Sequence, residues 1–156
     1  MKSSTDVAFS PAVKRVQAEH GSRSAYARLE NRGGFATEID DDLRAFLARI
    51  DTAFLATASA DGQPYVQHRG GPKGFIHALD DHTLAFTELD GNKQYISAGN
   101  LSENDRVCLL LMDFEHRQRV KVWGRARLEG DQMLITVSAW DANCPRHITP
   151  RVTSAW

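Results

Sequence analysis

The chain has 156 residues, of which 42% are hydrophobic. This length fits one domain with a substantial core, because a domain of this size buries roughly 70% of the surface of its unfolded chain. Its 19 Lys and Arg and 20 Asp and Glu leave a formal net charge of −1, which argues against broad capture of nucleic acid or anionic lipid. No stretch reaches the roughly 20 apolar residues that span a bilayer, and residues 1–10 contain no signal-like apolar run. We therefore expect a single cytoplasmic domain over residues 1–156, with no nucleic-acid or membrane partner.

The first third of the chain has a helical pattern. Ser10–Pro11 opens one or two short helices that are interrupted near Gly21 and ended by Gly33–Gly34. Asp40 or Asp41 can cap a further helix. Its apolar positions fall at helical spacing: Leu43, Phe46, Leu47 and Ile50. The sequence thus predicts a helical N-terminal segment over residues 1–50 that packs on the rest of the domain.

From residue 53 the hydrophobic pattern has a period of two, which is typical of strands. Residues 53–59 and 64–68 flank Asp61–Gly62, a dipeptide that supplies the positive φ angles of a tight hairpin. Residues 75–79 and 83–87 predict a second hairpin, followed by a short helix over 93–99 and by strands over 106–113, 117–128 and 134–140. A small closed or split barrel hides the edges that such a sheet would otherwise expose. The expected fold class is therefore mainly β, with about six or seven antiparallel strands and a few short flanking helices.

The strand expected over residues 117–128 carries cations on one face. Alternation places these side chains together: Arg117, Arg119, Lys121, Trp123, Arg125 and Arg127. Like charges side by side on a strand repel one another, so the row predicts an anionic ligand. A solvated face paired with acids on neighbouring strands is the alternative, and a bulge at Gly124 would turn Arg125 and Arg127 away. Those two arginines are therefore left out of the predicted site.

Three segments together resemble a known family. The runs Ala58–Tyr65, Phe86–Lys93 and Val120–Ala126 are similar in order and spacing to the FMN-binding split barrel of the pyridoxamine 5′-phosphate oxidase-like superfamily. The resemblance covers about residues 40–130. It implies a homodimer that binds FMN in a groove between the subunits.

The resemblance also implies roles for individual residues. The family's phosphate segment reads roughly Tyr-Thr-Asn-x-x-Ser-Arg-Lys; Thr87 and Lys93 match it, whereas Gly91 and Asn92 replace its Ser and Arg. The implied phosphate ligands are Arg69, Asn92, Lys93 and Lys121. The implied neighbours of the ring and ribityl chain are Gln67, His68, Thr87, Gln94, Arg119 and Trp123. Guanidinium and ammonium groups bind phosphate, and an indole can stack on a flavin ring, so these residue types suit that ligand.

Other side chains have simpler interpretations. Cys108 and Cys144 lack the number and spacing of a disulfide framework or a zinc site, so we expect no metal. The stretch Trp140–Arg151 does not reproduce the Arg-x-His motif of the true pyridoxamine phosphate oxidases, so vitamin B6 oxidation is not expected.

The expected function is that of an FMN-dependent oxidoreductase acting on an unidentified small substrate or electron donor. The sequence identifies no catalytic acid or base. Three alternatives stay open: a non-catalytic FMN storage or sensor protein, a haem-handling split barrel with a histidine ligand, and a binder of single-stranded nucleic acid along the Arg/Trp row. The near-neutral charge opposes the last of these.

Overall fold

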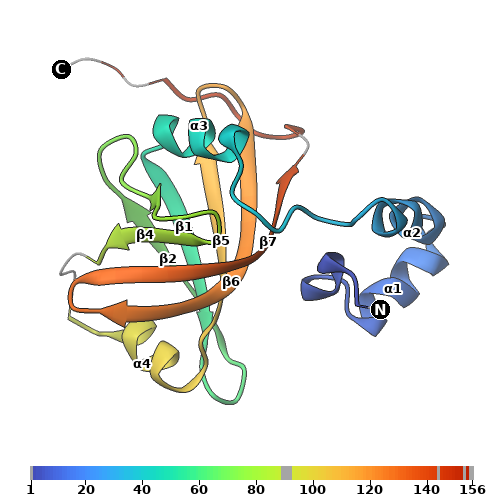
Figure 1. Ribbon diagram of the computed structural model, residues 1–156, viewed down its shortest axis with the longest axis horizontal. Helices are drawn as coiled ribbons and strands as arrows, with labels where there is room; N and C mark the ends of the chain where they lie inside the picture. The colour runs from blue at the N-terminus through green and yellow to red at the C-terminus, as the bar shows by residue number, and fades with distance from the viewer. Residues whose placement is uncertain (1, 89–92, 144, 153, 155–156) are drawn as a thin grey trace.

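Seven antiparallel strands form one strongly curved sheet in the computed structural model, which describes residues 2–88, 93–143, 145–152 and 154 (Figure 1). The strands are β1 (Thr52–Ala58), β2 (Pro64–Gly70), β3 (His77–Ala78), β4 (Thr83–Thr87), β5 (Arg106–Asp113), β6 (Gln118–Glu129) and β7 (Gln132–Asn143). Their order in the sheet is β2-β1-β5-β6-β7-β4-β3. The predicted fold class, mainly β with a split barrel, is confirmed, and both predicted hairpins are present.

The helices are η1 (Ser4–Val7), α1 (Pro11–Glu19), α2 (Arg23–Asn31), α3 (Asp41–Arg49) and α4 (Ile96–Glu103). The first three α-helices occur where the sequence predicts them. The helix predicted over 93–99 was placed too early, because α4 begins only at Ile96. Lys93 and Tyr95 have φ angles of 61° and 55°, in the left-handed region that a right-handed helix cannot contain. None of the described helices is long and apolar enough to cross a membrane.

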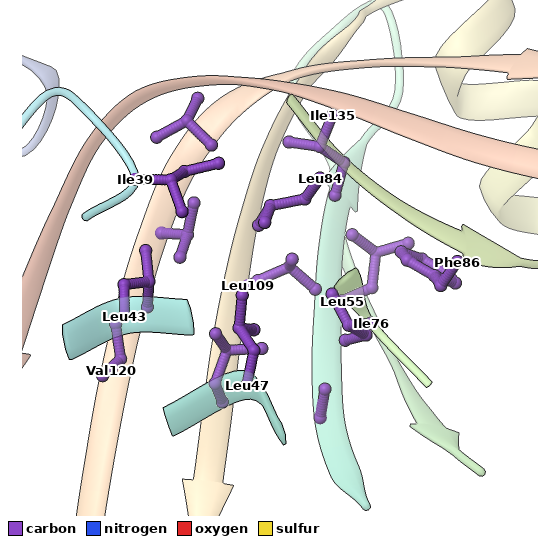
Figure 2. Close-up of a cluster of buried hydrophobic side chains, with 14 of the residues drawn as sticks. Ile39, Leu43, Leu47, Leu55, Ile76, Leu84, Phe86, Leu109, Val120 and Ile135 are labelled. Atoms are coloured by element: carbon purple, nitrogen blue, oxygen red, sulfur yellow. The ribbon is translucent and has the colours of Figure 1, made fainter. Parts of the chain in front are cut away.

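Helix α3 covers one end of the barrel. The Asp40 side chain caps it by accepting a hydrogen bond from the backbone N–H of Leu43 at 2.9 Å. Leu43 and Leu47 point from this helix into the core, where Leu55 of β1 and Leu109 of β5 also lie (Figure 2). Burying each such side chain stabilises the fold by about 1.5–3 kcal/mol. The apolar stripe of α3 therefore fixes the end of the barrel.

The N-terminal segment lies beside the barrel (Figure 1). Neither α1 nor α2 contains a buried residue. The segment is attached through buried Phe35 and through a bridge between Ala36 and Trp140, whose indole Nε1 also donates to the Glu38 carbonyl at 2.7 Å. These short contacts, together with the contact between η1 and β7, connect the N-terminal segment to the sheet.

A bulge occurs opposite Gly124, but its extra residue lies on β7 and not on β6. Trp123 pairs with Ala139 and Gly124 with Val137, so Ser138 is the extra residue. Burial along β6 continues to alternate without interruption through Gly124 and Ala126. Arg125 and Arg127 therefore keep the face of Lys121, so the alternative in which a bulge at Gly124 turns them away is wrong.

Candidate functional site

Strand pairing brings part of the predicted site onto one face of the sheet. Directly opposed residues of neighbouring antiparallel strands share a face. One row across β2, β1, β5, β6 and β7 consists of His68, Phe54, Leu110, Lys121 and Asp141. The next row consists of Val66, Ala56, Cys108, Trp123 and Ala139. We call this the outer face, because the barrel core lies on the opposite side.

The outer face carries an apolar surface, which we call the apolar panel, formed by Phe54, Val66 and Leu110. A charged residue, Lys121, lies at one side of this panel. Val66 is 62% exposed, and Phe54 and Leu110 are half-buried. The ring of His68 meets the ring of Phe54 edge-on, with centroids 5.6 Å apart. Lys121 stands at the β6 side of the panel, opposite Asp141. A flat apolar surface beside a cation suits a planar ligand that carries negative charge.

Lys121 acts electrostatically on both of its neighbours. Burial raises the pKa of Asp141, and the Lys121 ammonium opposes that rise. Burial likewise raises the pKa of the Cys108 thiol, with Lys121 again acting in the opposite direction. Cys108 therefore stays a protonated thiol at neutral pH, which makes it a poor nucleophile.

Arg119 lies at the junction between the outer face and a cleft. The cleft has a volume of about 710 Å³ and is bounded by α3, the start of β6 and the end of β7. Its lining includes Phe46, Val120 and Trp140 beside the arginine. The Nε atom of Arg119 is buried and has no hydrogen-bond partner among the described residues. A buried donor of this kind needs an acceptor, which a ligand or water can supply.

Trp123 is partly covered by its own chain. Its indole lies parallel to the ring of Phe35, with centroids 5.4 Å apart. Phe9 meets Phe35 edge-on at 5.5 Å. The expected stack of Trp123 on a flavin therefore requires the other face of the indole or a displacement of Phe35.

A second group of predicted residues lies on the inner side of β2. Gln67 and Arg69 are opposite the core residues Leu55 and Ala53, so they point away from the outer face. The side chain of Arg69 is only 9% exposed, and its Nη2 atom lies 2.8 Å from Oε1 of Glu88. The same Nη2 lies 3.4 Å from Oγ of Ser97 in α4. Arg69 is therefore held by an acid, and it is not a free cation.

The remaining predicted residues follow β4. Thr87 is exposed and accepts a hydrogen bond from Nε2 of Gln132 at 2.9 Å. Lys93 and Gln94 are also exposed and precede α4. Asn92 lies outside the described residues.

One chain thus places the predicted ligands in two groups. Gln67 and Arg69 lie on the inner side of β2, whereas His68, Arg119, Lys121 and Trp123 belong to the outer face. Strands β2 and β6 are also separated by three strand spacings, roughly 14 Å at about 4.8 Å each. The roles implied for these residues stay predictions.

Sequence reasoning missed two members of the inner group, Glu88 and Ser97. Glu88 follows the buried residues Leu84 and Phe86 at the spacing of a strand face, which was an available signal. Ser97 had no such signal, because the expected helix began too early. Among the described residues, no group of three or more His, Cys, Asp and Glu side chains could hold a metal ion.

Comparison with known proteins identifies the family. Among solved structures, HupZ from Group A Streptococcus is 21% identical, with a TM-score of 0.51 over 67% of this chain and 93% of that chain. A putative pyridoxamine 5′-phosphate oxidase from Lactobacillus delbrueckii is 20% identical, with a TM-score of 0.51 over 68% of this chain and 95% of that chain. At these identities the likeness shows a shared fold. A search of the curated proteins finds no match. The sequence model of the family described as pyridoxamine 5′-phosphate oxidase matches residues 39–146, more than half of the chain, and the chain therefore belongs to that family.

Proposed function

We propose that this chain is an FMN-binding, flavin-dependent oxidoreductase that acts as a homodimer on a small substrate or electron donor. In this arrangement each FMN lies between the outer face of one subunit and the β2–α4 region of the other. The observation that carries the proposal is the division of the predicted ligands between two sides of one sheet. A single FMN molecule can contact both groups of residues when one group comes from one subunit and the other group comes from a second copy of the chain.

The residues present fit FMN at several points. The apolar panel around Phe54 and Leu110 offers a flat surface for a ring system. Arg119 contributes a buried donor without a partner among the described residues, and a flavin ring carries acceptors at its edge. Lys93 is exposed and offers its ammonium group to a phosphate. When bound, FMN would supply the capacity to take up or release a hydride or electrons, because that chemistry resides in the cofactor.

The protein's contribution would be binding, orientation and exclusion of water. The outer face is partly uncovered in a single chain, and a second subunit placed on it would shield the ring from solvent. Arg119 and Lys121 would orient the anionic and acceptor-rich edges of the ligand. Cys108 would serve as a packing residue, because its raised pKa keeps it protonated. Vitamin B6 phosphates are not the proposed substrates, since the C-terminal stretch lacks the corresponding motif.

The first test is a visible absorption spectrum of the purified protein before and after addition of FMN and removal of the unbound fraction. Flavin bands at about one FMN per subunit, followed by bleaching with NADH or NADPH under anaerobic conditions, are the expected result. Flavin that no nicotinamide cofactor reduces would support the storage or sensor alternative. A Soret band would indicate the haem alternative. Absence of any retained chromophore would contradict the proposal.

A matched pair of variants tests the shared site. Val66 on the outer face and Leu79 before β4 are both exposed apolar residues, at 62% and 56% exposure. Val66→Glu should leave the subunit folded and abolish both dimer formation and FMN retention, because a second subunit cannot bury the new charge. Leu79→Glu should change neither. Light scattering after gel filtration measures the mass, and a monomeric Val66→Glu protein that still retains FMN would exclude a site shared between subunits.

A further inference from the structure

The buried ion pair between Arg69 and Glu88 joins the two ends of the sheet. Arg69 lies on β2, the first strand in the sheet order, and Glu88 directly follows β4, near the last. Their closest side-chain atoms, Nη2 and Oε1, are 2.8 Å apart. Ser97 of α4 lies beside the pair and donates to Oε1 of Gln67 at 3.3 Å. The pair is therefore fixed by β2, β4 and α4 together.

Each member of the pair retains one unused polar atom. Nε of Arg69 and Oε2 of Glu88 are both buried, and neither has a hydrogen-bond partner among the described residues. The Arg69 side chain is 9% exposed and that of Glu88 is 25% exposed. Buried polar atoms without partners are costly, so this free donor and free acceptor mark a place for a group that satisfies both.

The chemistry of that group follows from the two atoms. A phosphate dianion can accept from Nε of Arg69, but it has no proton to donate to Oε2 of Glu88, and the carboxylate repels it. A hydroxyl accepts from the first atom and donates to the second. Because Glu88 also neutralises the charge of Arg69, the pair as a whole offers little attraction to an anion.

We propose that the Arg69–Glu88 pair binds a hydroxyl of a polyol chain, namely the ribityl chain of the flavin, and that it does not hold the phosphate. This inference rests on the proposed FMN site and assigns Glu88 as a specificity-determining residue within it. It changes the role that the sequence implied for Arg69, and leaves Lys93 and Lys121 as cations for the phosphate.

Three flavins separate the possible roles of the pair. FMN has a ribityl chain and a phosphate, riboflavin has the ribityl chain alone, and lumiflavin has neither. Dissociation constants of all three are measured by flavin fluorescence with the native protein and with Glu88→Gln. This variant keeps the size of the side chain and removes its charge. We expect it to weaken riboflavin binding by about tenfold or more, because a hydroxyl loses its bond to a charged acceptor, and to leave lumiflavin binding unchanged.

Asp81→Asn is the matched control, since it removes one negative charge from an exposed ion pair with Arg44. This control should leave the dissociation constants of FMN, riboflavin and lumiflavin unchanged. Unchanged riboflavin affinity in Glu88→Gln, with tighter FMN binding, would overturn the inference and assign the pair to the phosphate. Unchanged affinity of Glu88→Gln for both riboflavin and FMN would also overturn the inference. If the native protein binds none of the three, the proposed FMN function falls, and the ribityl assignment falls with it.

Discussion

The indole of Trp123 and the phenyl ring of Phe35 lie nearly parallel, with an interplanar angle of 2° and centroids 5.4 Å apart. Phe9 packs edge-on against Phe35, and Tyr26 packs edge-on against Phe9. This aromatic series connects the N-terminal helices to β6. Phe35 is therefore one anchor of a segment whose helices α1 and α2 bury no residue of their own.

Phe35→Ala should loosen the N-terminal segment while the barrel stays folded. The change removes a stacked aromatic contact worth about 0.5–1.5 kcal/mol beyond the burial of the ring. Limited proteolysis should cut between residues 32 and 39 faster than in the native protein, and the tryptophan emission of the protein should shift to the red as Trp123 becomes more exposed. Val16→Ala is the control, because Val16 is 52% exposed on α1. Equal cleavage rates in both variants would show that Phe35 does not anchor the segment.

Most of the fold followed from local signals in the sequence. Asp61–Gly62 identified the first hairpin, and the spacing of Leu43 and Leu47 identified α3. The start of α4 was missed because Lys93 and Tyr95 adopt the left-handed backbone conformation, which the residue types at these two positions do not indicate.

The candidate site was harder to predict than the fold, because it depends on which side chains the curvature of the sheet brings together. Gln67, His68 and Arg69 are consecutive, so alternation alone places His68 opposite the other two. This alternation could be read from the sequence. The ion pair between Arg69 and Glu88 could not be predicted from it, because the pair forms only when the curved sheet brings β4 close to β2.

Gly124→Ala should destabilise the fold, because the backbone of β7 passes close to this residue at the bulge. A Cβ atom at position 124 would lie 2.3 Å from the carbonyl oxygen of Thr136. We expect a loss of about 1–3 kcal/mol in the free energy of unfolding, measured by urea denaturation, because the backbone must shift. Gly99→Ala is the control, since a Cβ there meets nothing within 4 Å. That substitution should stabilise α4 by about 0.5–1 kcal/mol. A Gly124→Ala protein as stable as the native one would contradict the close approach.

Asp113 should make the free energy of unfolding depend on pH in the acid range. Burial alone would raise the pKa of this carboxyl, but hydrogen bonds from the His116 backbone N–H, the Arg49 guanidinium and the His116 ring outweigh it, and the pKa is lowered. Nδ1 of His116 lies 2.9 Å from Oδ2, and Nε of Arg49 lies 3.3 Å from the same oxygen. Because the pKa is lower in the folded state, the stabilisation is present above the unfolded value of about 3.9 and is lost as pH falls through the folded value.

Asp113→Asn should therefore be less stable than the native protein at pH 7, and the difference should shrink as the pH is lowered toward 2. Urea denaturation at a series of pH values measures it. Glu115→Gln, in the same turn and exposed, is the control and should leave the pH profile unchanged. A constant difference between Asp113→Asn and the native protein at every pH would contradict the linkage.

Lys93→Gln should weaken FMN binding and spare riboflavin. Lys93 is exposed and shortly precedes α4, whereas Arg69 is already paired with Glu88. Loss of one charge-assisted contact at an exposed position costs about 1.5 kcal/mol, or roughly tenfold in the dissociation constant of FMN. Lys14→Gln, which removes an equal charge from the N-terminal segment, should have no effect on either flavin. If Lys93→Gln weakens FMN and riboflavin equally, the ammonium contacts the part that the two ligands share, and the phosphate must be bound by other groups.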